Sequence, residues 1–411
     1  METGKKVSII LPNYNGAKYL KNAIDSVLRQ TYRNYEFIIV DDCSTDNSRD
    51  IISSYDDQRI VKCFEDKNRH VAYTVNKGFR IASGEYIARI DSDDVWDSTK
   101  LEKQVEFMER NQEYGACFTK VHIIDEFGEI ADDKYDALVK SYNNNGNRSQ
   151  GEWAKFFLQK GNCLCNPSVL MRRDALEKIG KYYNIAYIPG QDFELWTRMV
   201  IKYPIYILDE KLTFYRWTEE ESKISGMDDE SAHAFFNVHM LVRHNYLDKM
   251  SEDEFRELFG DEFRNKQSRT KEELECEKAY LLLDCVKDAP NINFLGMIRF
   301  EKILNTLGGL DILEKEFQMS LKNFYKNYRT NNFANAVVNE KLESKKREAD
   351  YLKEIIKLKE SIICNEEKEL ERQKDQLKRL QDELTAVYNS KSWKMTYPLR
   401  RFKEKLNSLM E

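Results

Sequence analysis

The chain has 411 residues, of which 41% are hydrophobic and 33% charged, and its formal net charge is −6 at pH 7. A chain of this length exceeds what one hydrophobic core usually supports, so we expect two or three structural units. The negative charge argues against a nucleic-acid-binding protein, which usually carries a basic excess. No apolar run approaches the roughly 20 residues of a membrane span, and none follows Met1, so we expect a cytoplasmic protein.

The first third of the sequence alternates between strand-like and helix-like segments. Short β-branched and aromatic runs predict strands, and apolar residues spaced at i, i+3, i+4 and i+7 predict amphipathic helices. This alternation indicates an α/β protein whose mostly parallel sheet is covered by helices on both faces. The expected strands are 7–11, 35–40, 59–64 and 85–90, and the expected helices are 18–30, 72–82 and 100–110, with a shorter helix around residue 51.

Two groups of aspartates follow expected strands. Asp41 and Asp42 end the second strand, and Asp91, Asp93 and Asp94 follow the fourth. Ligands of such sheets bind outside the carboxyl ends of the strands. Several carboxylates on one turn repel each other unless a cation lies between them, and Mg²⁺ or Mn²⁺ with oxygen ligands would also neutralise a diphosphate leaving group. The alternative is a solvated aspartate-rich turn that caps the next helix.

Beyond residue 125 the pattern becomes less regular. The segment 132–150 is polar, and we expect its asparagine-rich part, 142–147, to be a mobile loop. A helix is expected at 192–201, and two strands, 205–208 and 213–217, would close the domain. The residues from about 228 to 335 then read as helices without a catalytic cluster.

The last part of the chain carries a heptad repeat. A second row at the same spacing is polar in its middle, from Lys359 to Gln373, which favours a weak or partner-dependent coiled coil. The alternative is a single solvated helix with ion pairs between successive turns. The apolar row consists of Leu342, Ala349, Ile356, Ile363, Leu370, Leu377 and Leu384.

Several segments together resemble glycosyltransferase family 2. The resemblance covers roughly residues 5 to 220, in the family's order and spacing, and it implies a GT-A fold, a nucleotide-diphosphate sugar donor and transfer with inversion. The segments are VSIILPNYN from residue 7, SVLRQTY from 26, EFIIVDDCSTD from 36, NKG from 76, ASGEYIARIDSDD from 82, NPSV from 166 and QDFELW from 191.

The resemblance assigns the donor's nucleotide to the first strands. Pro12 and Tyr14 would line the nucleotide pocket, with Tyr14 packing on the base. Asp42 would accept a hydrogen bond from a uracil or thymine imide, and Asp41 would support Asp42 or bind ribose. The donor would accordingly be a UDP- or dTDP-sugar.

The aspartate motif and the acceptor side follow from the same resemblance. Asp91 and Asp93 would be the D-x-D pair, with Asp93 the direct ligand of Mn²⁺ or Mg²⁺ and Asp91, together with Ser92, nearer the ribose. Asp192 matches the base that deprotonates the acceptor hydroxyl, and it could also cap its helix. Donor or acceptor contacts are further assigned to Asp94, Gln191 and Trp196, although Gln191 stands where the family usually has an acidic residue.

The sequence thus predicts an enzyme that acts on a glycan or polyprenyl-linked glycan in bacterial surface-polysaccharide synthesis. The alternative is a non-catalytic nucleotide-sugar-binding scaffold that acts through its coiled coil. A nucleotidyltransferase or a dinucleotide dehydrogenase would carry a glycine-rich loop after the first strand, and none is present. We expect a catalytic domain at 1–225 (donor half 1–125, acceptor half 126–225), a helical region at 226–335, a coiled coil at 336–389 and a basic, aromatic segment at 390–411.

The final segment is similar to a short ending of many bacterial glycosyltransferases. Trp393, Tyr397 and Phe402 could insert at a lipid interface while neighbouring cations meet anionic head groups, which predicts peripheral membrane contact. The alternative is packing on the coil or on a partner protein. The coil itself predicts a homo-oligomer.

Overall fold

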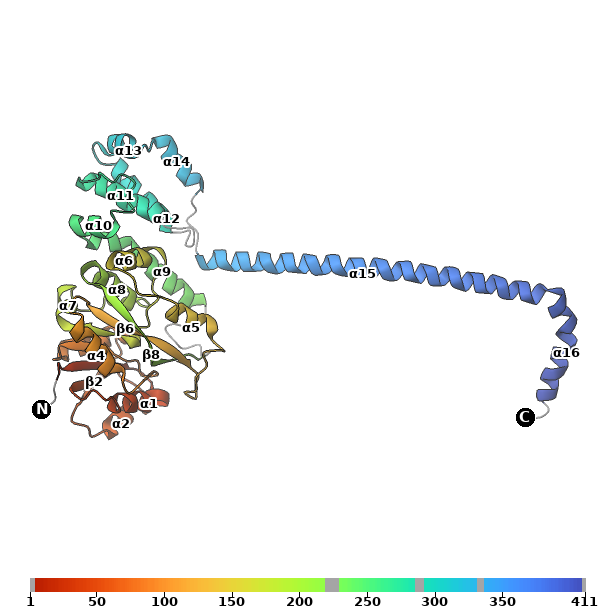
Figure 1. The fold of residues 1–411 in the computed structure, drawn as a ribbon, viewed down its shortest axis with the longest axis horizontal. Coiled ribbons are helices and arrows are strands. Elements are labelled where there is room, and N and C mark those ends of the chain that lie inside the picture. Colours follow the sequence, from red (N-terminus) through yellow and green to blue (C-terminus); the bar gives the residue numbers. More distant parts are fainter. Residues whose placement is uncertain (1–3, 219–228, 285–291, 331–335, 409–411) are drawn as a thin grey trace. The chain divides into compact units, whose positions relative to one another are not determined.

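The structure is a computed structural model, and it describes residues 4–218, 229–284, 292–330 and 336–408. The chain divides into two compact units, Met1–Val337 and Val338–Glu411. The first unit contains a β-sheet with its covering helices and a group of further helices (Figure 1). The predicted boundary at residue 225 lies outside the described residues.

Eight strands form one mixed sheet in the first unit. The α/β class is confirmed, although β7 runs antiparallel to both of its neighbours, β4 and β6, and so interrupts the parallel order. The pairs β1–β2, β1–β4, β2–β3 and β6–β8 are parallel. The strands, in spatial order, are β3 (Ile60–Phe64), β2 (Tyr35–Asp41), β1 (Val7–Asn13), β4 (Tyr86–Arg89), β7 (Leu170–Arg172), β6 (Ala116–Ile124), β8 (Ile205–Arg216) and β5 (Val95–Trp96).

Helices cover both faces of the sheet because the strands are apolar on both sides. In β1, Val7, Ile9 and Leu11 pack in one core, and Ile10 packs in the other. This continuous apolar run is typical of a strand buried on both faces. The first core includes helices α1 (Ala17–Leu28), α2 (Ser48–Ser54) and α4 (Lys100–Arg110), and the second includes α3 (His70–Ile81), α6 (Gln150–Gln159), α7 (Arg173–Lys178) and α8 (Gln191–Lys202).

Further helices follow the sheet. Helices α9 (Asp229–Tyr246) and α10 (Glu252–Phe259) pack on the core of the sheet domain through residues such as Val242 and Phe255. A separate small core around Tyr280 and Phe300 joins α11 (Lys271–Asp284), α12 (Ile292–Leu304), α13 (Gly309–Phe317) and α14 (Leu321–Thr330).

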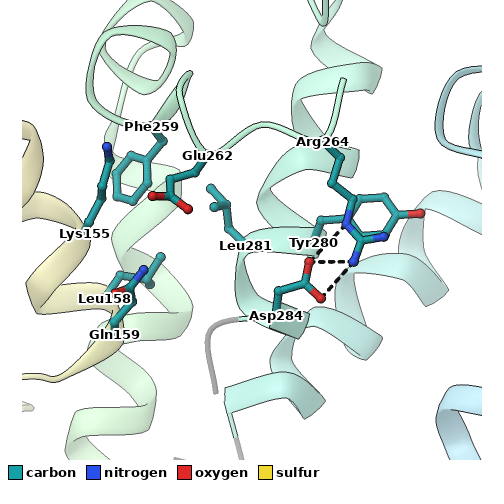
Figure 2. Close-up of a pocket in the computed structure, with 9 residues that line it drawn as sticks. All are labelled: Lys155, Leu158, Gln159, Phe259, Glu262, Arg264, Tyr280, Leu281 and Asp284. Atoms are coloured by element: carbon teal, nitrogen blue, oxygen red, sulfur yellow. Dashed lines mark hydrogen bonds and ion pairs between the residues drawn. The ribbon is translucent and has the colours of Figure 1, made fainter. Parts of the chain in front are cut away.

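A pocket lies between α6 and the α10–α11 segment (Figure 2). Within it, the Arg264 guanidinium lies 4.0 Å from the Tyr280 ring centroid and 2.6 Å from an Asp284 carboxylate oxygen. None of the predicted site residues lines this pocket. Its lining consists of Lys155, Leu158, Gln159, Phe259, Glu262, Arg264, Tyr280, Leu281 and Asp284.

The asparagine-rich segment is ordered where a mobile loop was expected. Asn143 ends α5 (Asp136–Asn143), and its side chain both accepts from Val121 N at 2.9 Å and donates to Val121 O at 2.8 Å. Asn147 makes the same two contacts with the backbone of Ile207, at 2.7 and 2.9 Å. The prediction is wrong for these residues because an amide carries a donor and an acceptor, which together match one residue of a strand edge.

The two strands expected at 205–208 and 213–217 form one strand, β8. Its polar middle, Asp209 to Lys211, hid this continuity in the sequence. The pairing of β8 with β6 shifts register on both sides of Lys120. Extra residues in one strand of a ladder produce this kind of local irregularity.

The second unit contains α15 (Ala336–Asn389) and α16 (Lys391–Asn407). The apolar heptad row lies on the surface of α15, with Ile356 and Leu377 56% and 58% exposed. Leu342 lies outside the described side chains, and the coiled coil stays a prediction beside the single-helix alternative. Among the described residues, no helix is both long and apolar enough to cross a bilayer.

Lys100 is a fully buried amine at the start of α4. Its Nζ donates to Gln104 Oε1 at 2.8 Å and lies 3.8 Å from the Trp96 ring centroid. Burial lowers the pKa of Lys100 to about 7 because the interior disfavours the charged form.

We predict that Lys100→Met flattens the pH dependence of stability. Between pH 7 and 10.5 the folded wild type binds fewer protons at this position than the unfolded chain does, so its stability rises with pH. The variant should lack this contribution, which is at most about 1.4 kcal/mol per pH unit. Urea unfolding across this pH range measures the difference, and equal pH slopes for both proteins would contradict the prediction.

Candidate active site

The two acidic turns lie at the same end of the sheet, where the parallel strands β1, β2 and β4 end. Asn13 and Asp41 are paired at the ends of β1 and β2, and Asp91 follows β4, the other neighbour of β1. A Cβ on Gly16 would lie 2.3 Å from Asn13 Oδ1 and 2.9 Å from Ser92 Oγ. The loop after β1 therefore touches the turn that contains Ser92, and this close approach requires glycine.

Asp41 and Asp42 are both buried. Asp41 accepts hydrogen bonds from Asn13 Nδ2 at 2.9 Å, Ser44 N at 3.0 Å and Arg49 Nε at 2.8 Å. These donors occupy both of its oxygens, which favours the supporting role over ribose binding. The Asp42 carboxylate accepts from Arg69 N, which lies 3.0 Å from each of its oxygens.

Pro12 and Tyr14 differ in their exposure. Pro12 is buried within β1, where it is paired with Val40 of β2. Tyr14 lies just beyond the strand and is 50% exposed. Its ring is therefore accessible to a planar ligand beside the acidic turns, as the predicted packing on a base requires.

Asp91 forms an ion pair with a buried arginine. Arg89, the last residue of β4, is 3% exposed, and its Nη2 donates to Asp91 Oδ1 at 2.6 Å. The Asp91 side chain is still 28% exposed. Arg89 was not predicted as a site residue, although a charged residue in the apolar run Tyr86–Ile90 was a usable signal.

Arg216, at the end of β8, holds the Asp93–Asp94 turn. Its backbone N donates to Asp94 Oδ1 at 2.8 Å, and its Nε donates to the Asp93 carbonyl at 2.7 Å. Its guanidinium also donates to the Asp125 carbonyl and lies 4.3 Å from the Tyr19 ring centroid. Asp94 is fully buried and so is a structural residue of this turn, whereas Asp93 is partly exposed.

Asp192 is the second residue of α8. Gly190 is the N-cap of this helix, with a φ of 133° that glycine adopts easily, so the capping role predicted for Asp192 is wrong. The Asp192 carboxylate accepts from Phe193 N at 2.8 Å and from Asn162 Nδ2 at 3.1 Å. Burial raises its pKa above the usual aspartate value, against the opposing effects of the Phe193 hydrogen bond and of the positive charge of Arg89.

Gln191 and Trp196 lie on the same helix as Asp192. Gln191 is 7% exposed, and its Oε1 accepts from Gly190 N at 3.1 Å. Trp196 is fully buried, and its ring packs edge-on against Phe118 at 4.9 Å between centroids. The structure thus corrects the contact role predicted for Trp196, because a side chain inside the core does not reach a ligand.

A hydrogen-bond network connects the donor half with the segment before α8. The Tyr183 hydroxyl donates to Asn166 Oδ1 at 3.0 Å and lies 3.4 Å from Arg89 Nη1. The Asn76 side chain pairs with the Tyr183 backbone through bonds of 2.8 and 2.9 Å. The motifs NKG and NPSV therefore position Arg89 and its surroundings, a role that the sequence analysis did not assign.

The pair Asp91 and Asp93 fits the ligand set of a hard divalent cation. Both carboxylates are partly exposed and stand on one turn. No three His, Cys, Asp or Glu side chains form a ready metal-binding group in the described part of the chain. Mg²⁺ is usually held by one or two carboxylates together with substrate phosphates, so two carboxylates suffice.

Comparison with known proteins identifies the family. The family model "Glycosyl transferase family 2" matches residues 8–180. An uncharacterized glycosyltransferase of Nostoc sp. is 34% identical over 223 residues, 51% of this chain and 64% of that protein. An uncharacterized glycosyltransferase of Methanocaldococcus jannaschii is 30% identical over 237 residues, 56% of this chain and 78% of the relative.

A third relative carries a named activity. The Escherichia coli protein "UDP-Glc:alpha-D-GlcNAc-diphosphoundecaprenol beta-1,3-glucosyltransferase" is 31% identical over 196 residues, which are 48% of this chain and 70% of that protein. The chain therefore belongs to glycosyltransferase family 2, a family of sugar-transferring enzymes.

Proposed function

We propose that the enzyme transfers a sugar from a UDP- or dTDP-sugar to a hydroxyl group of a glycan carried on a polyprenyl diphosphate, with inversion at the anomeric carbon. The named activity of the Escherichia coli relative supports the class of donor and acceptor. Its likeness to this chain also supports a place in the synthesis of a bacterial surface polysaccharide.

The environment of Asp192 is the observation that carries the proposal. A base must be ionised, held in place and able to take a proton, and the contacts from Phe193 N and Asn162 hold this carboxylate. Its raised pKa strengthens it as a proton acceptor. In the proposed step the acceptor oxygen bonds to the anomeric carbon, its proton passes to Asp192, and the bond to the diphosphate breaks with its electron pair leaving on the diphosphate.

The donor would lie along the acidic edge of the sheet. Tyr14 would stack on the base of the nucleotide. The Asp42 carboxylate would accept a hydrogen bond from the imide of that base once the carboxylate faces the nucleotide. Asp91 and Asp93 would hold a Mn²⁺ or Mg²⁺ ion, which supplies charge neutralisation to the leaving diphosphate. The ion pair with Arg89 would hold the Asp91 carboxylate in place on this turn.

The second candidate is a nucleotide-sugar-binding scaffold that acts through α15. Its long exposed helix favours an interaction role. Two observations favour the enzyme. Asp91 and Asp93 are partly exposed, and hydrogen bonds hold the carboxylate of Asp192, the proposed base. The next experiment separates these candidates.

We predict that Asp192→Asn lowers transfer about 10²–10⁴-fold and leaves donor affinity within a few-fold of the wild-type value. The amide keeps the size of the side chain and loses the proton-accepting oxygen. Radiolabelled sugar transfer and calorimetric UDP binding measure the two effects. Asp209→Asn, at an exposed aspartate of the same domain, is the control. Unchanged transfer in Asp192→Asn would refute its role as the base, and no transfer by the wild type to any lipid-linked acceptor would favour the scaffold.

For the metal, we predict that Asp93→Asn weakens Mn²⁺-dependent UDP binding about 10–100-fold, because the amide is a poorer ligand of a hard cation. Calorimetry with and without Mn²⁺ gives the metal-dependent part of the affinity. Asp133→Asn, at an exposed aspartate of the polar segment 132–150, should leave this part unchanged. Equal metal dependence in Asp93→Asn and the wild type would contradict the assignment.

For the turn, we predict that Arg216→Met destabilises the fold by about 3 kcal/mol and weakens UDP binding at temperatures where the variant is folded. The change leaves two partly buried carbonyls, those of Asp93 and Asp125, without this donor. Lys211→Met, on the same strand, removes a partly exposed partner of Asp132 and should cost less than about 1 kcal/mol. Chemical unfolding and calorimetry test this, and equal effects of both variants would contradict it.

A further inference from the structure

Helix α16 carries a narrow apolar stripe on its surface. Met395, Leu399, Phe402 and Leu406 follow each other at steps of four, three and four residues, which places them on one side of an α-helix. They are 77%, 70%, 67% and 45% exposed. Four large apolar side chains in one row are therefore available to an apolar partner.

Cations border this stripe. At 3.6 residues per turn, Lys391, Lys394 and Lys405 fall along one border and Lys403 along the other, whereas Glu404 falls on the opposite side. The helix has one acidic residue and six basic residues, although the whole chain has a net charge of −6. The basic residues are Lys391, Lys394, Arg400, Arg401, Lys403 and Lys405.

The stripe does not continue the heptad rows of α15. Counting on in sevens from Leu384 reaches Lys391, Pro398 and Lys405, and counting on from Val387 reaches Lys394 and Arg401. A coil extended in register would thus place cations and a proline at its seam. In addition, α15 ends at Asn389 and a new helix begins at Lys391.

We propose that α16 binds in the interface of an anionic lipid bilayer, with the stripe Met395–Leu399–Phe402–Leu406 inserted and the bordering cations at the head groups. An apolar stripe bordered by lysine and arginine matches such a surface in both polarity and charge, and long basic side chains reach the head groups from partly inserted positions. The inference goes beyond glycosyl transfer, because binding to vesicles requires neither donor nor acceptor.

The residues of this proposed contact differ in part from those that the sequence suggested. Phe402 belongs to both sets, whereas Tyr397 lies on the side of the helix opposite the stripe. The side chain of Trp393 lies outside the described residues.

Tyr397 and Phe402 offer a matched pair of variants. Phe402→Asp and Tyr397→Asp each replace an exposed ring by the same charge on the same helix, but only Phe402→Asp interrupts the stripe. The full-length proteins are tested by co-sedimentation with phosphatidylcholine vesicles that contain phosphatidylglycerol, and with vesicles of phosphatidylcholine alone. UDP binding and light-scattering mass establish that each variant keeps its fold and its oligomeric state.

We predict that wild type binds the anionic vesicles, with an affinity that falls as salt is raised and is much lower for phosphatidylcholine alone. Phe402→Asp should weaken this binding at least about 10-fold through the loss of apolar contact, and Tyr397→Asp by about fivefold or less through its charge. Equal losses in the two variants, or no vesicle binding by wild type, would overturn the proposal. A mass halved by Phe402→Asp, with no binding of wild type to vesicles, would instead assign the stripe to a second copy of the chain.

Discussion

Five aspartate carboxylates crowd the carboxyl-terminal ends of the central strands, and their mutual repulsion is the constraint on which the rest of the domain depends. The buried ones are held by donors from other segments. Arg49 and Ser44 bind Asp41, the backbone of Arg69 binds Asp42, and the backbone of residue 216 binds Asp94. Loops and strands far apart in the sequence must come together to complete this arrangement, so the acidic edge also organises the fold around it.

The same arrangement separates structural aspartates from those available to a ligand. Asp41 and Asp94 are buried and accept internal hydrogen bonds, whereas Asp91 and Asp93 are partly exposed on a turn that Arg216 holds. The buried Arg89 precedes this turn and donates a hydrogen bond to Asp91. Its positive charge also lowers the pKa of Asp192, against the effect of burial. One buried cation thus connects the proposed donor site with the proposed base.

Much of the sheet domain was predictable because local patterns reflect local physics. The apolar run at Val7 and the helical spacing at 100–110 gave elements close to the observed β1 and α4. Both acidic turns were expected at strand ends. The crossing partners were not predictable, because Arg216 and Asp94 are 122 residues apart and no periodic pattern relates them. The strand-edge contacts of Asn143 were missed for a similar reason, since its side chain is satisfied by the backbone of Val121 on another element. The continuity of β8 was missed because the polar residues in its middle pair with side chains distant in the sequence, Asp209 with Lys120 and Lys211 with Asp132.

A crystal structure of the protein with UDP and Mn²⁺ tests the central claim most directly. The account predicts that the metal ion contacts both the Asp93 carboxylate and the diphosphate, and that the uracil lies beside Tyr14. The end of the diphosphate that carries the sugar in the donor should face Asp192. A nucleotide bound away from the Asp91–Asp94 turn, or a diphosphate bound there with full occupancy and no metal ion in the presence of excess Mn²⁺, would contradict it.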